Sequence, residues 1–169
     1  TDTVSLGNVG DSAHAQINTL TVTGDDGITL TGAIYTDGSA GAANVTFNDK
    51  VTIDGAVTID TDDSANDGAI VFTTSIDGEG NDTDSLTIES GSGAITFQAI
   101  GATTGLTTLT VNTGSTDTAA ITVPNIGSGA LGAATVTGVT GVTTIGGTAT
   151  DSVVLSGTIY KTGGAITIT

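Results

Sequence analysis

Two acidic segments hold the residues most able to do chemistry, and the chemistry they suggest is calcium binding. Calcium takes six to eight oxygen ligands from closely spaced carboxylates, amides and carbonyls. The first segment offers oxygens at Asp60, Asp62, Ser64, Asn66 and Asp67. The second offers them at Asp77, Glu79, Asn81, Asp82 and Asp84. We therefore predict candidate structural Ca²⁺ sites in these two loops, with solvated and mutually repelling turns as the alternative interpretation.

The first segment begins like an EF-hand loop but departs from it at two positions. Ala65 stands where the sharp turn needs glycine, and Val71 stands where the last ligand needs glutamate. Any bound calcium would therefore be structural and would relieve charge repulsion between the carboxylates. We predict that no cofactor is required.

The residues typical of catalytic sites are scarce. His14 is the only histidine, and no nucleophile and carboxylate accompany it as a triad would require. The segment 127–132 fits the pattern G-x-G-x-x-G, but strand-like sequence follows it where a phosphate-binding loop needs a helix. The chain has no Trp, and its only two cationic residues are Lys50 and Lys161, so few groups could hold a sugar. We predict that the protein is not an enzyme, and a polysaccharide-active enzyme is the weakest alternative.

The charge balance excludes several kinds of partner. The sequence has 18 Asp and Glu against 2 Lys and Arg, which gives a formal net charge of −16 at pH 7. So little positive charge cannot neutralise the phosphates of a nucleic acid or an anionic membrane surface. The absence of Cys excludes a disulfide scaffold and a thiolate zinc site. No apolar run approaches the length of about 18 residues that membrane insertion needs.

The elements that must position the acidic loops are short β-strands. Apolar residues alternate with Thr in many segments, among them Leu20–Val22, Val51–Ile53, Leu86–Ile88 and Ile166–Ile168. Period-two alternation is typical of a half-buried strand. Gly, Asp, Asn and Ser lie between these segments and favour turns.

The strands recur at a fixed interval. The three phenylalanines, Phe47, Phe72 and Phe97, are separated by 25 and 25 residues, and Val22 lies 25 residues before the first of them. The segment 120–123 follows one interval later, and 143–145 and 165–168 are looser members of the same series. A second strand follows each member after about a dozen residues, as at Ala33–Tyr35 and Thr158–Tyr160.

This interval predicts an all-β protein with a parallel β-helix fold, a β-solenoid of about 25 residues per coil and about seven coils. Each unit cannot bury its own apolar face, and stacking aligns equivalent strands about 4.8 Å apart. We expect a single solenoid segment over 1–169, with regular, acidic coils at 17–123 and less regular, Gly- and Thr-rich coils at 124–169. An antiparallel β-sandwich is the alternative fold.

Two further patterns concern the surface. The sequons Asn44–Thr46 and Asn81–Thr83 fit N-x-[ST], and only the second is expected in an accessible loop. Thr pairs such as Thr21/Thr23 and Thr108/Thr110 resemble the Thr rows on the flat face of ice-binding solenoids, but they do not recur at a fixed step, so we do not expect an ordered, ice-binding row of Thr on one face.

The repeats resemble a known family. The segments VTIDGAVTIDTD, GAIVF, LTIESGSGAITF and IGATTGLTTLTVNTG are similar to repeats of very large secreted bacterial surface proteins, the filamentous-haemagglutinin-like and autotransporter-like β-helical adhesins. The resemblance covers most of the chain and is strongest over 28–123. It implies a right-handed parallel β-helix, export to the cell surface, and a role as a rod or filament in adhesion. It transfers no catalytic residue.

We therefore expect a secreted, extracellular structural protein, a non-catalytic rod from a bacterial filament or giant surface adhesin. The sequence stops within an apparent strand, so we expect end-to-end self-association or continuation in a longer chain, and a host or cell-surface ligand is a candidate partner. The alternative function is a Ca²⁺-dependent binding module that recognises a glycan or a partner protein.

Overall fold

The computed structural model describes residues 2–11, 17–36, 41, 43–62, 66–81, 83–114, 117–129, 137–148 and 151–169. In this part of the chain all regular structure is β-strand, and the strands form three parallel sheets. The predicted all-β parallel solenoid is confirmed.

We name the three sheets A, B and C. Sheet A contains β1 (Val4–Leu6), β3 (Ile28–Leu30), β6 (Val51–Ile53), β9 (Ser75–Gly78) and β12 (Ala99–Ile100). Sheet B contains β4 (Ile34–Tyr35), β7 (Ala56–Asp60), β10 (Ser85–Glu89), β13 (Thr108–Val111), β15 (Thr143–Ile145) and β17 (Ile166–Ile168). Sheet C contains β2 (Leu20–Val22), β5 (Val45–Phe47), β8 (Ile70–Phe72), β11 (Ile95–Thr96), β14 (Ala120–Val123) and β16 (Ser152–Leu155).

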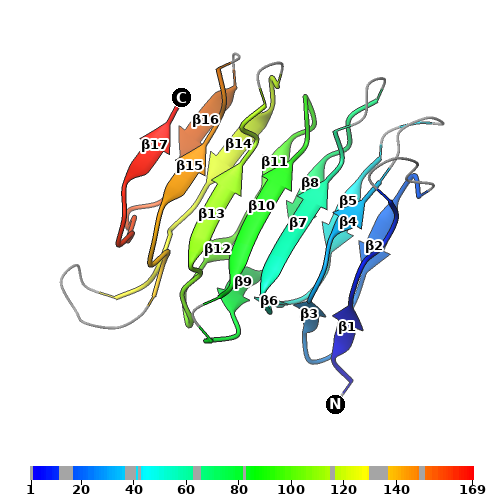
Figure 1. Ribbon diagram of the computed structural model, residues 1–169, viewed down its shortest axis with the longest axis horizontal. Coiled ribbons are helices and arrows are strands. Elements are labelled where there is room, and N and C mark those ends of the chain that lie inside the picture. Colours follow the sequence, from blue (N-terminus) through cyan, green and yellow to red (C-terminus); the bar gives the residue numbers. More distant parts are fainter. Residues whose placement is uncertain are drawn as a thin grey trace.

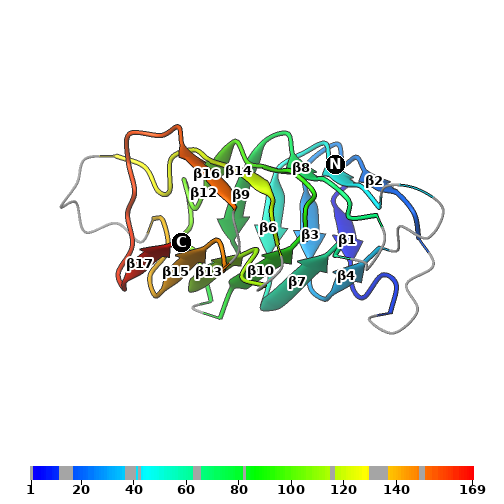
Figure 2. The same ribbon diagram turned by 90° about the horizontal axis from the view of Figure 1, so that it is seen from above.

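One turn of the solenoid visits the sheets in the order C, A, B. The chain passes from β2 to β3 to β4 and then returns to sheet C at β5, beside β2. Equivalent strands of successive turns therefore lie side by side along the long axis, and the two chain ends lie at opposite ends of the molecule (Figure 1). The view along the perpendicular direction shows the sheets enclosing a narrow interior (Figure 2).

The register confirms the spacing that the sequence predicts. Leu20 pairs with Val45, and Phe47 pairs with Phe72, so equivalent positions of sheet C are 25 residues apart. In sheet B the step is less regular, because Val57 pairs with Leu86 and Leu86 with Leu109. The strands keep their alignment while the corner loops change length, because the ladder hydrogen bonds fix the strands and not the loops.

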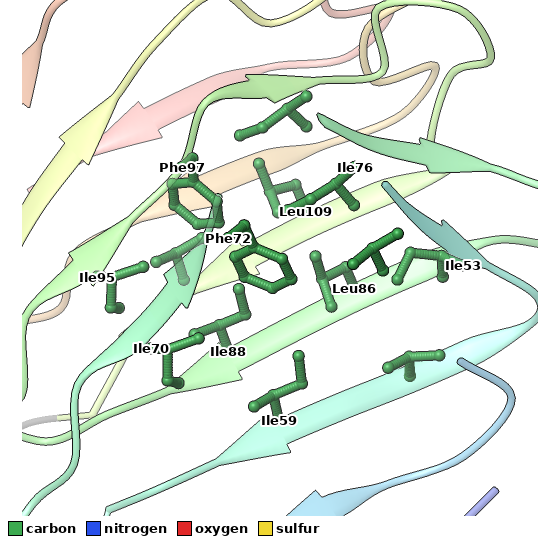
Figure 3. Packing of buried hydrophobic residues seen from close by; sticks show 14 of the residues in the cluster. Ile53, Ile59, Ile70, Phe72, Ile76, Leu86, Ile88, Ile95, Phe97 and Leu109 are labelled. Carbon is green, nitrogen blue, oxygen red and sulfur yellow. The ribbon is translucent and has the colours of Figure 1, made fainter. Parts of the chain in front are cut away.

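The interior is a set of apolar columns. Inward-facing Val, Ile and Leu side chains from all three sheets are buried, and the three phenyl rings stack at the centre of the column from sheet C. The ring centroids of Phe47 and Phe72 are 5.1 Å apart, and those of Phe72 and Phe97 are 5.6 Å apart. Figure 3 shows Phe72 and Phe97 in this stack, with Ile70 and Ile95 beside them. The core thus consists of like side chains from successive turns.

The irregular part of the chain differs from the sequence-based prediction. The stack has about six turns, whereas the spacing predicted about seven. Residues 143–145 and 165–168, expected in the phenylalanine series, belong to sheet B as β15 and β17. Tyr160 was expected in the same series of second strands as Ala33–Tyr35. It instead forms a parallel β-bridge with Ile126, which bridges in turn to Ile100 of sheet A.

The reason is a change in step length after β14. Ile121 pairs with Val153, and Leu109 pairs with Thr143, so these steps exceed the 25-residue interval. Because the chain between these strands is longer, counting 25 residues along the sequence reaches a segment of a different sheet in every later turn. Pairing in space depends on the ladder and the buried side chains, so it is unaffected by this shift.

Removing one ring of the central stack tests the core. We expect Phe72→Ala to lower the free energy of unfolding by about 3–5 kcal/mol, because it leaves a cavity between two stacked turns. Val71→Ala, on the outward side of the same strand, is the matched control and should cost much less. Chemical denaturation measures both, and equal effects of the two substitutions would contradict the central position of the ring.

Candidate functional site

The first acidic segment forms the corner between sheets B and C, and a buried hydroxyl closes its loop. Thr61 Oγ1 donates to the carbonyl of Gly68 at 2.6 Å, and the Gly68 amide donates back to the Thr61 carbonyl at 3.2 Å. The turn before repeats this contact with Thr36 and the Ala43 carbonyl, at 2.6 Å. A buried Thr therefore fixes where the chain leaves the stack and where it returns.

The same corner continues as a buried polar column in later turns. Ser90 Oγ donates to the Gly93 carbonyl at 2.7 Å and to Asn112 Oδ1 at 3.1 Å. Asn112, which has a left-handed φ of 50°, donates from Nδ2 to the Gly91 carbonyl and to Asp151 Oδ1. Buried polar groups are costly unless paired, and each turn here pairs with the next. The sequence does not predict this column, because Thr, Ser and Asn at unequal steps give no period.

Among the predicted calcium ligands of this corner, one bonds within its own turn and one links two turns. Asp60 Oδ1 accepts a hydrogen bond from the Asp62 amide at 3.0 Å. Asp67 Oδ2 accepts from the amide and the hydroxyl of Ser92, one turn later, at 2.7 and 2.6 Å. Asn66 is exposed, and Ser64 lies outside the described residues. Asp67 therefore joins two turns directly.

The second acidic segment lies at the corner between sheets A and B, and its two buried carboxylates also hold backbone groups. Asp77 Oδ1 accepts from the amides of Thr103 and Thr104, at 2.7 and 3.3 Å. Asp84 accepts from the Gly55 amide at 3.1 Å through Oδ1 and from the Gly80 amide at 2.9 Å through Oδ2. Both side chains are buried. Their oxygens thus replace missing ladder acceptors where the chain turns.

The remaining candidates of this segment point outward. Glu79 and Asn81 are exposed, and Asp82 lies outside the described residues. Within the described ranges no group of three or more His, Cys, Asp or Glu side chains is arranged to hold a metal ion. Calcium binding at either loop stays a prediction from the sequence.

The structure also brings together three carboxyls that the sequence did not connect. Glu89 lies directly opposite Asp60 in the ladder between β10 and β7, and Asp117 lies near both. Burial raises the pKa of Glu89, and the negative charges of Asp117 and Asp60 add to the shift, against hydrogen bonds from Thr113. Burial is also the largest cause of the raised pKa of Asp60 and of Asp117.

These raised pKa values predict a protein that gains stability on mild acidification. The folded protein binds protons at these sites more tightly than the unfolded chain does. The stabilisation is fully present below the unfolded-state pKa of about 4 and is lost as the pH rises through the raised values.

We expect Glu89→Gln to raise the free energy of unfolding at pH 7 by about 0.2–1 kcal/mol, because it removes one of two charges that face each other. It should also flatten the pH dependence of the melting temperature between pH 7 and pH 5. Glu79→Gln, in an exposed loop, is the control for a general loss of charge. A lower stability of Glu89→Gln at pH 7 would contradict this account.

The outer face of sheet B carries an ordered row of threonines, contrary to the expectation from the sequence. The pairings align five hydroxyl side chains on consecutive strands, namely Thr58, Thr87, Thr110, Thr144 and Thr167. Unequal loop lengths hide this row in the sequence. Cross-strand Thr pairs stabilise a sheet, so the row has a structural explanation.

Two other sequence candidates lie wholly or partly outside the part of the chain that the structure describes. His14 lies outside the described residues, as do positions 130–132 of the glycine motif. Gly127 and Gly129 adopt left-handed φ values of 82° and 70°, which a turn requires. In the described part of the chain, no helix is long and apolar enough to cross a membrane.

Comparisons with known proteins give no family assignment. The sequence matches no protein-family model, and neither the curated proteins nor the solved structures yielded a match.

Proposed function

We propose that this protein is a structural, non-catalytic rod of an extracellular bacterial filament or giant surface adhesin. It extends by stacking end to end or as turns of a longer chain. The observation that carries the proposal is the continuity of the ladders, since sheets B and C each join six strands without interruption. A stack of this kind bears load along its axis through many parallel hydrogen bonds.

The distribution of charge and apolar surface supports the same role. Residues 49–89 hold 11 of the 18 acidic residues, whereas Asp117 and Asp151 are the only ones after Glu89. Self-repulsion keeps acidic rods soluble and discourages contact along their sides. The nearly uncharged end of the stack lacks this repulsion.

The turn formed by β16 and β17 exposes apolar side chains. Four of them are 41–53% exposed, namely Val154, Leu155, Ile166 and Ile168. Ile166 and Ile168 are in register with Thr143 and Ile145, which are buried, so they occupy core positions of the last turn. A further turn, from a second copy or from the same chain, would bury them, and we propose self-association as the principal interaction.

Electron microscopy of the purified protein tests the stacking. We expect rods longer than one chain, and we expect the double substitution Ile166→Lys and Ile168→Lys to abolish them by placing two charges on the open end. Thr167→Lys adds a charge to the outward side of the same strand and should leave the rods intact. If the unmodified chain and both variants gave only single particles, end-to-end stacking would be excluded, and continuation in a longer chain would be the remaining form of the rod.

Immunogold labelling of intact cells that produce the protein, and of thin sections of the same cells, tests the location. We expect gold particles on filaments or on the outer surface, in line with a secreted rod that can meet a host or cell-surface ligand. Label confined to the cell interior would overturn the proposed extracellular role, whatever the purified protein does.

A further inference from the structure

The loop between β9 and β10 presents an exposed asparagine in a defined local conformation. Asn81 and Thr83 are both exposed, and with Asp82 between them they meet the N-x-[ST] pattern, in which the middle residue is not proline. Asn81 Oδ1 accepts two hydrogen bonds from Thr83, one from its amide at 3.1 Å and one from its hydroxyl at 2.6 Å. The asparagine and the threonine of the sequon are therefore already hydrogen-bonded to each other in the folded protein.

The loop is held on both sides, although its tip is exposed. The Gly80 amide donates to the buried carboxylate of Asp84 at 2.9 Å, and the Glu79 amide donates to the Ile53 carbonyl of the preceding turn at 2.9 Å. Gly80 has a left-handed φ of 109°, which glycine adopts without strain. These contacts turn the chain outward just before Asn81, which is exposed at the corner between sheets A and B.

From this geometry we propose that Asn81 is a site of N-glycosylation. The donor is a lipid-pyrophosphate-linked oligosaccharide, and the catalyst is an oligosaccharyltransferase. Asn81 Nδ2 attacks C1 of the first sugar, and the new N–C bond forms as the C–O bond to phosphate breaks. The lipid pyrophosphate leaves with the electron pair, and one Nδ2 proton passes to a carboxylate base of the transferase.

The two hydrogen bonds from Thr83 favour this step. An amide nitrogen is a weak nucleophile because its lone pair is delocalised into the carbonyl group. Donors on Oδ1 stabilise the negative charge that gathers there as an Nδ2 proton is lost, in the same way that hydrogen bonds to a charged form favour it.

The second sequon is a matched internal comparison. Asn44 is half-buried, and its Oδ1 accepts a hydrogen bond from the Ala69 amide of the next turn at 2.8 Å. Thr46 lies within β5 and pairs with Thr21 and Val71 on its two sides. A transferase could engage Asn44 only after this ladder opens, so the folded protein offers one acceptor of the two.

A reaction with purified components tests the assignment. The folded chain is incubated with an oligosaccharyltransferase and a lipid-linked oligosaccharide of known mass, and intact-mass spectrometry counts the glycans. We expect one glycan on the folded chain, none on Asn81→Gln, and one on Asn44→Gln. Thr83→Ala should lose the glycan and Thr83→Ser should keep it, while thermal melts show that both variants remain folded.

The control for enzyme activity is a synthetic peptide with the sequence of residues 77–86. Modification of the peptide but not of the folded chain would overturn the proposal, and so would a glycan on Asn44 of the folded chain. In cells the reaction requires export, so its occurrence there rests on the proposed extracellular role. The purified reaction does not depend on export, so failure of one proposal is distinguishable from failure of the other.

Discussion

The parallel pairing of each strand with its equivalent one turn later is the constraint on which the rest of this structure depends. It places identical or similar side chains in columns, so a phenylalanine meets a phenylalanine and a threonine meets a threonine. Small aliphatic residues can then build a core without large aromatic groups, because the interior is only one side chain deep from each sheet. Each buried Val, Ile or Leu contributes about 1.5–3 kcal/mol, which is offset largely by chain entropy.

Parallel pairing cannot satisfy the backbone at the corners, because a chain that turns leaves amides and carbonyls without ladder partners. Two kinds of side chain satisfy them. Hydroxyls, an amide and carboxylates do so at the corner between sheets B and C, and buried carboxylates do so at the corner between sheets A and B. Acidic residues that resemble a metal site in the sequence can thus be acceptors for backbone amides. The same reasoning separates Asp84, which anchors its loop, from Asn81, which the loop presents to solvent.

The same geometry brings like charges close together. Parallel stacking brings acidic residues of neighbouring turns to the spacing of adjacent strands, as with Asp60 and Glu89. Burial is the largest cause of the raised pKa values of Asp60 and Glu89, and the charge of Asp117 raises both further, with that of Asp60 adding to the shift of Glu89.

The sequence by itself determined the strands, the parallel solenoid and the column of Val22, Phe47, Phe72 and Phe97, because these follow from alternation and from a regular 25-residue step. The tertiary structure decided the features that the 25-residue interval does not specify. It assigned residues 143–145 and 165–168 to sheet B, aligned the threonine row, and turned Asp77 and Asp84 inward. The physical reason is that corner loops can lengthen at little cost, so position along the chain stops predicting position in space. Whether a carboxylate faces water or a backbone amide depends on groups supplied by another turn.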